Sequence, residues 1–249
     1  CELFLCDTER VGFIFEREVD IMCLKIKRSL EKAKERKTMK YQETREKVLE
    51  VAVKCLNKGL IHGTAGNVSM RVPGEDVVII TPSGIPYDQL TPEQLPAVSL
   101  HAELLDGEFK PSTETPMHTA VYRARKNLNG IVHTHSMFAT VFSILEKEIP
   151  PMMPPSTPYA PVPVAPFELP GSEELGQAAV NALGENKMVC TLQNHGLLAA
   201  CPTLDRAFSA AEYIEECAQL AYWTMQAGKM NPLPDEAVQT LRDRMLRGI

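Results

Sequence analysis

Two histidines separated by one residue, His133 and His135, could bind a metal ion together. The apolar residues before them predict a strand over 131–135, in which side chains alternate between the two faces. The two imidazoles would then point the same way, about 7 Å apart, which suits a shared divalent ion. The alternative is a purely structural role for the pair. A third ligand must come from elsewhere, and His195, at a predicted tight turn before Gly196, is the leading candidate.

A carboxylate could join these histidines from the segment 111–116, which reads Pro-Ser-Thr-Glu-Thr-Pro. Thr115 and Pro116 predict the N-cap and first residue of a helix that runs to about residue 126. Free backbone N–H groups and the helix dipole favour an anion at such a helix start. Glu114 is then an ordinary first-turn acid, a fourth metal ligand, or a general base beside the metal. The other histidines, His62, His101 and His118, have no partner at a comparable spacing and are expected to be core or surface residues.

Two further loops share this affinity for anions. Segment 63–69 reads Gly-Thr-Ala-Gly-Asn-Val-Ser, and segment 81–84 reads Thr-Pro-Ser-Gly after a predicted strand. The first lacks the lysine of a phosphate-binding P-loop and the spacing of a dinucleotide-binding loop, so a nucleotide is disfavoured. Each loop alone is more typical of a structural turn. Together with the histidines, the loops favour a small phosphorylated substrate on a metal, without a large organic cofactor.

The elements that must position these residues alternate between helix and strand. Residues 150–170 hold nine of the nineteen prolines and predict a long, stiff surface connection. Without repeats or a Gly/Ser linker, one α/β domain is the simplest organisation, and its central sheet should be mainly antiparallel because two strands flank His195 closely. Apolar periodicity, caps and breakers predict helices over 43–58, 115–126, 138–146, 172–183, 203–226 and 235–247, and strands over 77–80, 131–135, 188–192 and 196–200.

Composition narrows the class of protein. The chain has 249 residues, 44% of them hydrophobic, and a formal net charge of −6. This balance is that of a globular domain and disfavours a nucleic-acid partner. We find no apolar run long enough for a membrane helix and no signal-peptide pattern, so no membrane partner is expected. The seven cysteines form no CxxC pair or dense framework, which favours a reduced, cytoplasmic setting.

The first 38 residues differ from the rest. They hold three of the seven cysteines, lack a clear period until about residue 26, and end in Lys-Glu-Arg-Lys-Thr just before Met39. A purine-rich ribosome-binding site read in frame would encode such residues. We therefore expect residues 1–38 to be an N-terminal extension translated from upstream sequence, and 39–249 to be the catalytic domain. A genuine helical extension is the alternative.

The motifs resemble those of the class II aldolase/adducin family, and within it most resemble the L-fuculose-1-phosphate aldolases. The resemblance covers about residues 41–247. Five segments carry it, in the family's order and approximate spacing: 63–69 (GTAGNVS), 80–87 (ITPSGIPY), 111–114 (PSTE), 132–136 (VHTHS) and 193–196 (QNHG).

This resemblance implies a three-layer α/β/α fold with a central, mainly antiparallel sheet, assembled as a homotetramer with active sites between subunits. It implies that His133, His135 and His195 bind a catalytic Zn²⁺ or another divalent metal. Glu114 would be the fourth ligand in the resting site and the acid/base once substrate displaces it. The substrate phosphate would be held by Thr64, Asn67, Ser83, Gly84, Ser112 and Thr113.

The implied reaction is metal-dependent cleavage of a ketose 1-phosphate, similar to L-fuculose 1-phosphate, into dihydroxyacetone phosphate and an aldehyde. A metal on the carbonyl and hydroxyl oxygens would stabilise the enediolate, so no Schiff-base lysine is required. The chain departs from the fuculose-phosphate aldolases in three places. Asn194 replaces the first of two histidines, no tyrosine occurs in the last nine residues, and the proline-rich segment differs where those enzymes have a substrate-facing tyrosine, for which Tyr159 is a candidate replacement.

Other members of the family suggest alternative activities. L-Ribulose-5-phosphate 4-epimerases share the metal site but typically have Asp at the position of Glu114, which favours the aldolase. Methylthioribulose-1-phosphate dehydratases use a similar site for loss of water. The adducin-like branch consists of interaction modules without the metal histidines, and the presence of all three here argues against that class.

Overall fold

An eight-stranded sheet forms the centre of the fold in the computed structural model, which describes residues 39–246. The strand order is β4-β3-β2-β1-β5-β8-β7-β6, and all neighbours are antiparallel except β6 and β7. The predicted central, mainly antiparallel sheet is therefore confirmed. The strands are β1 (Asn67–Arg71), β2 (Val77–Ile80), β3 (Ala97–Ser99), β4 (Leu104–Asp106), β5 (Gly130–Thr134), β6 (Val164–Ala165), β7 (Val189–Leu192) and β8 (Gly196–Cys201).

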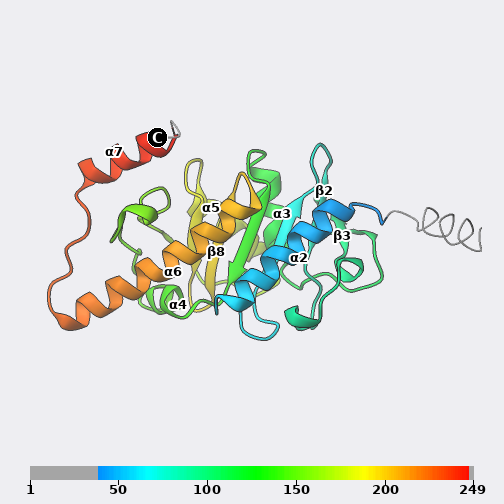
Figure 1. Cartoon of the computed structure of the whole chain (residues 1–249), viewed down its shortest axis with the longest axis horizontal. Coiled ribbons are helices and arrows are strands. Elements are labelled where there is room, and N and C mark those ends of the chain that lie inside the picture. Colours follow the sequence, from blue (N-terminus) through cyan, green and yellow to red (C-terminus); the bar gives the residue numbers. More distant parts are fainter. Residues whose placement is uncertain (1–38, 247–249) are drawn as a thin grey trace, which may run out of the picture. The chain divides into compact units, whose positions relative to one another are not determined.

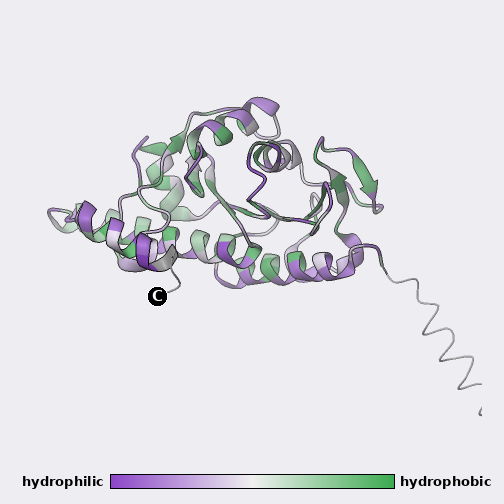
Figure 2. Ribbon diagram, turned by 90° about the horizontal axis from the view of Figure 1, so that it is seen from above, coloured by the Kyte–Doolittle hydropathy of each residue, from purple (hydrophilic) through white to green (hydrophobic). Residues whose placement is uncertain are grey.

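Helices cover both faces of this sheet (Figures 1 and 2). Buried side chains of α2, α4 and α6 form one hydrophobic cluster with the sheet, and those of α3 and α5 form a second. The predicted three-layer α/β/α arrangement is thus also confirmed. The helices are α2 (Gln42–Asn57), α3 (Thr115–Ala124), α4 (Met137–Ile144), α5 (Glu173–Leu183), α6 (Leu204–Ala227) and α7 (Asp235–Leu246), with short 3₁₀ turns at Tyr87–Gln89, Pro92–Gln94 and Pro154–Ser156.

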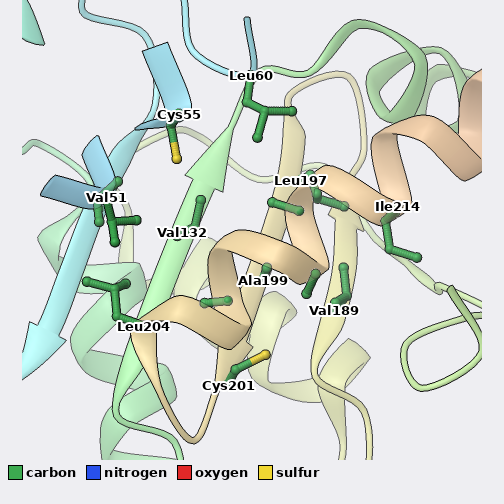
Figure 3. Packing of buried hydrophobic residues seen from close by; sticks show 14 of the residues in the cluster. Val51, Cys55, Leu60, Val132, Val189, Leu197, Ala199, Cys201, Leu204 and Ile214 are labelled. Atoms are coloured by element: carbon green, nitrogen blue, oxygen red, sulfur yellow. The ribbon is translucent and has the colours of Figure 1, made fainter. Parts of the chain in front are cut away.

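Strand residues alternate between the two clusters. In β8, Leu197 and Ala199 face α2 and α6, as Figure 3 shows, whereas Leu198 packs on the side of α3 and α5. In β5, Val132 faces α6 and Ile131 faces α3 in the same way. A sheet covered on both faces needs apolar side chains at consecutive positions, which explains the short continuous apolar runs in the sequence.

The sequence did not predict four of the strands, namely β1, β3, β4 and β6. Residues 67–69, interpreted as the end of a loop, belong to β1 at the centre of the sheet, between β2 and β5. The proline-rich segment 150–170 is not only a surface connection, because β6 extends the sheet edge and Ala160 and Val162 are buried. Prolines fit there because an edge strand needs few N–H donors. A proline can still accept a hydrogen bond through its carbonyl, as Pro163 does from the Thr191 N–H at 2.9 Å.

The predicted N-terminal extension, residues 1–38, lies outside the described residues, so its boundary with the catalytic domain stays a prediction. The first described helix, α2, begins at Gln42, one residue before the predicted start of its amphipathic pattern. Within residues 39–246, none of the helices combines the length and apolar character needed to cross a bilayer.

Candidate metal centre

His133 lies near the end of β5 with its ring fully buried. The strand pairs it with Asn67 of β1 on one side and Leu198 of β8 on the other. His133 Nδ1 lies 2.9 Å from the carbonyl oxygen of Leu197, to which it must donate because a carbonyl only accepts. In the neutral ring, this contact leaves Nε2 with a free lone pair, the form that binds a metal ion.

His135 lies one residue beyond the end of β5, so the prediction of a strand reaching residue 135 is wrong by one residue. Its ring nevertheless lies on the same side of the sheet as the ring of His133, and the two Nε2 atoms are 3.2 Å apart. Burial and the neighbouring His133 lower the pKa of His135 to about 4. The ring is therefore neutral at pH 7 and can offer a lone pair.

His195 approaches from the turn between β7 and β8. Asn194 takes the left-handed conformation there (φ 55°), and Gly196 starts β8 against the backbone of β5. The predicted tight turn between two strands is confirmed. His195 Nε2 lies 3.1 Å from Glu114 Oε1, and the three histidine ring centroids are 4.8–5.0 Å apart.

Glu114 is only 5% exposed and occupies the N-cap position of α3, which places this position one residue earlier than predicted. Its backbone N–H donates to Ser112 Oγ at 3.2 Å, which caps the chain as it enters the helix. Its Oε2 lies 3.0 Å from His133 Nε2. Burial alone would raise the pKa of Glu114, but His133 and His195 hold it well below its usual range, so the carboxylate is ionised.

These four side chains bring their ligand atoms within 4.8 Å of one another. Glu114 Oε1 is buried and accepts no hydrogen bond from any residue that the structure describes. A buried carboxylate needs a positive charge beside it, which a cation bound among these four groups would supply. Three imidazoles and one carboxylate are a donor set that suits Zn²⁺ and other divalent transition metals. The arrangement therefore fits a divalent metal ion.

The three predicted phosphate-binding loops are tied to one another beside this centre. Tyr87 links two of them, because its hydroxyl donates to the Gly66 carbonyl at 2.7 Å and lies 3.2 Å from Thr81 Oγ1. The third loop joins through the Ser112 N–H, which donates to the Thr81 carbonyl at 3.2 Å. Of the predicted phosphate ligands, Thr64, Ser83, Gly84 and Thr113 are exposed, Ser112 is half-buried and Asn67 is buried.

Asn67 differs from the other predicted phosphate ligands because its carboxamide already has protein partners. Its Nδ2 donates to Glu114 Oε2 at 2.7 Å, and its Oδ1 lies 2.5 Å from His118 Nε2. One amide hydrogen remains for a substrate. Asn67 thus connects the loop at the start of β1 to the carboxylate of the candidate metal centre.

Sequence reasoning missed His118, Ser69 and Tyr122. His118 was expected to be an isolated core or surface histidine, but it is fully buried and hydrogen-bonded behind Glu114. Spacing could have revealed the group. Residues 114, 118 and 122 recur every four positions and so share one helix face, while 67 and 69 share one strand face.

Tyr159 does not take the predicted position facing substrate. Its side chain is 2% exposed and lies in the cluster beneath α6. It lines a cavity of about 580 Å³ with Met188, just before β7, and Arg206, near the start of α6. Met188 and Arg206 lie at the end of the sheet opposite to His195, so Tyr159 lies away from the candidate metal centre.

Comparisons with known proteins agree with this fold and site. The family model "Class II Aldolase and Adducin N-terminal domain" matches residues 46–222. The chain is 36% identical over 204 residues to 5-deoxy-D-ribulose 1-phosphate aldolase of Bacillus thuringiensis, which covers 82% of this chain and 95% of that protein. It is 32% identical over 209 residues to L-fuculose phosphate aldolase of Escherichia coli K12, which covers 83% and 95%.

Among solved structures, an L-fuculose 1-phosphate aldolase superposes with a TM-score of 0.78 at 28% identity, covering 82% of this chain and 96% of that one. The matched family model spans the candidate metal centre and all three loops. The chain therefore belongs to the class II aldolase/adducin family.

Proposed function

We propose that this protein is a metal-dependent sugar-phosphate aldolase, which cleaves a ketose 1-phosphate into dihydroxyacetone phosphate and an aldehyde. The first candidate for its divalent metal is Zn²⁺. The observation that carries the proposal is the convergence of His133, His135, His195 and Glu114 on one point. Relatives named as aldolases of 5-deoxyribulose 1-phosphate and fuculose phosphate support the substrate class.

The three histidines and Glu114 would hold the metal. A divalent ion there supplies Lewis-acid stabilisation of the negative charge that develops when the carbon–carbon bond breaks. In cleavage, the hydroxyl group on the carbon that becomes the aldehyde loses its proton to a base as the carbon–carbon bond breaks. Glu114, ionised in the resting site, must first take up a proton, which it then donates to the carbon that becomes the hydroxymethyl group of dihydroxyacetone phosphate. In condensation, Glu114 removes that carbon-bound proton.

The three linked loops bind the substrate phosphate in this proposal, through Thr64, Asn67, Ser83, Gly84, Ser112 and Thr113. Hydroxyl groups and backbone N–H groups are the donors that a phosphate needs. Four of these residues are exposed, so a ligand can reach them. Their role is to orient the substrate rather than to break a bond.

The experiment offers the metal-loaded protein three substrates: L-fuculose 1-phosphate, 5-deoxyribulose 1-phosphate and L-ribulose 5-phosphate. The expected result is release of dihydroxyacetone phosphate. This product is measured through the oxidation of NADH when glycerol-3-phosphate dehydrogenase reduces it. A product of unchanged mass would indicate an epimerase, and a product lighter by one water would indicate a dehydratase. Either outcome without triose phosphate would refute the aldolase.

Glu114→Gln tests the role of the carboxylate, because the amide keeps the size of the side chain but cannot transfer the proton. We expect turnover to fall by at least about 100-fold while the protein still binds metal through its histidines. Full activity in this variant would refute the role of Glu114. A metal-free preparation that keeps full activity would refute the metal-dependent mechanism.

We also propose that the protein is a cytoplasmic homotetramer with active sites between subunits. An exposed apolar group supports an interface: Phe138, Tyr222 and Trp223 contact one another, Trp223 is 55% exposed, and Met137 beside them is 66% exposed. Cys55, Cys190, Cys201 and Cys217 are buried free thiols, as a reducing compartment favours. Light scattering should give four times the 27.6 kDa chain mass, and a monomer would refute the assembly.

A further inference from the structure

A chain of hydrogen bonds runs behind Glu114 through four polar side chains of α3 and β1. Asn67 Nδ2 donates to Glu114 Oε2 at 2.7 Å, and Asn67 Oδ1 lies 2.5 Å from His118 Nε2. His118 Nδ1 lies 2.7 Å from Ser69 Oγ, which lies 2.9 Å from the Tyr122 hydroxyl. All five side chains belong to residues that are at most 5% exposed, so solvent has little access to the chain.

The chemistry of the groups fixes the direction of the hydrogen bonds from Glu114 as far as Ser69. An ionised Glu114 can only accept, so Asn67 must turn its NH₂ group toward Glu114 and its carbonyl oxygen toward His118. His118 Nε2 must then carry a hydrogen. A neutral imidazole has one N–H, so Nδ1 accepts and the Ser69 hydroxyl donates to it. Burial lowers the pKa of His118 to about 3, in agreement with a neutral ring.

The two oxygens of Glu114 are therefore not equivalent. Each oxygen lies near one histidine, Oε2 3.0 Å from His133 Nε2 and Oε1 3.1 Å from His195 Nε2, but within the described part of the chain only Oε2 also accepts a hydrogen bond, from Asn67. Without a donor at position 118, the Asn67 amide could rotate and turn its oxygen toward Glu114. Two oxygens would then face each other in a buried site, which favours displacement of the carboxylate.

We propose that His118 is a positioning residue: through Asn67 it fixes the Glu114 carboxylate, with Oε2 hydrogen-bonded and Oε1 left to exchange the proton with substrate. The inference rests on the proposed aldolase function and adds a residue to it that never touches substrate. It predicts a loss in the proton-transfer step rather than in binding of the substrate phosphate.

The test compares His118→Gln, His118→Asn and His118→Leu in the full chain loaded with Zn²⁺. The Gln carboxamide is long enough to donate to Asn67 and to accept from Ser69, the shorter Asn lacks the reach toward Asn67, and Leu offers no donor. We expect kcat to fall about 10- to 100-fold for Leu and Asn, with KM within about twofold and bound Zn²⁺ unchanged, and Gln to restore most of kcat. Equal kcat in the wild type and all three variants would overturn the proposal, as would a uniform loss that includes Gln.

Deuterium exchange isolates the step in question. The protein is incubated in D₂O with dihydroxyacetone phosphate and no aldehyde, and incorporation of deuterium at the hydroxymethyl carbon is followed by NMR. Exchange should slow with kcat in the Leu and Asn variants. Exchange at the wild-type rate in these variants would overturn the positioning role.

A readout independent of catalysis separates this proposal from the proposed function. Two-dimensional ¹H–¹⁵N NMR of the wild-type protein, with His118 assigned by its loss in the Gln variant, should show Nε2 protonated and Nδ1 unprotonated. A protonated Nδ1 would overturn the proposal even in an active aldolase. If the wild type instead releases no triose phosphate, the aldolase function fails while the assigned tautomer of His118 still stands.

Discussion

Gly196 packs against Thr134 so closely that a Cβ atom on Gly196 would lie 2.2 Å from the Thr134 carbonyl oxygen. Thr134 ends β5 directly before His135, and Gly196 starts β8 directly after His195. The same added atom would lie 3.4 Å from His133 Cε1. The contact between these two backbones therefore sets the distance between the segments that supply three of the four candidate ligands.

Gly196→Ala should destabilise the protein by about 1–3 kcal/mol, because the strands must separate to admit the methyl group. We also expect weaker Zn²⁺ binding, since His195 moves with the strand. Urea unfolding of the metal-free protein and Zn²⁺ titration measure the two effects. Gly74→Ala is the control: it strains a positive φ of 77° but meets no atom within 4 Å, so Zn²⁺ binding should not change. Wild-type Zn²⁺ affinity in Gly196→Ala would contradict the expected coupling.

Removal of one imidazole should weaken the metal site without unfolding the protein. His135→Ala is the best variant because His135 is only half-buried and lies outside the strand, whereas His133 is fully buried within it. We expect Zn²⁺ affinity at least about tenfold lower, measured by competition with a chelator. The matched variant His101→Ala removes an exposed histidine and should bind Zn²⁺ as the wild type does. Equal affinities in the two variants would exclude His135 as a ligand.

Much of the fold follows from local sequence signals. The starts of α5 and α6 could be predicted because Ser172 and Thr203 cap them through their side chains, accepting the N–H groups of Leu175 and Arg206. The strand-turn-strand around His195 could be predicted because apolar runs lie on both sides of it. β1 was missed because Gly63 and Gly66 marked a loop, although the strand begins directly after Gly66.

In the candidate site, too, the sequence indicates some residues and not others. Residue types and spacing made the three histidines and Glu114 candidates, because few side chains bind a divalent metal, and the family resemblance implied that the four act together. The partners of Glu114 could not be found in that way. The contact between Asn67 and His118 joins β1 to α3 over 51 residues of chain, and only the pairing of β1 with β5 brings Asn67 to the site. A pattern within one helix or strand does not contain that information.

Acid should destabilise the metal-free protein below about pH 6.5. In the folded chain, burial lowers the pKa of His118 to about 3, and burial with His133 lowers that of His135 to about 4, from an ordinary value of 6.5. As pH falls below 6.5, the unfolded chain takes up protons at these positions before the folded chain does, so unfolding is favoured. The free energy of unfolding should therefore decrease from pH 6.5 toward pH 4, as urea titrations at each pH can measure.

His118→Gln supplies the control for this pH dependence. The variant removes one of the two titrating groups but keeps a polar side chain that can bond to Asn67. Its free energy of unfolding should decrease less steeply between pH 6.5 and 4 than that of the wild type. A slope as steep as that of the wild type would show that His118 does not contribute.

Glu215 of α6 should stabilise the start of α4, which follows His135 by two residues. Its carboxylate accepts the N–H groups of Phe138 at 2.9 Å and Ala139 at 2.8 Å, which have no partner within the helix. Glu215→Gln replaces a charged acceptor by a neutral amide, and we expect a loss of about 1–2 kcal/mol in the free energy of unfolding. Glu216→Gln next to it removes the same charge at an exposed position and should change the stability by less than about 0.5 kcal/mol. Because α4 continues the chain from His135, the first variant should also bind Zn²⁺ more weakly than the second. Identical urea midpoints and Zn²⁺ affinities in the two variants would show that the Glu215 contact does not support the candidate metal centre.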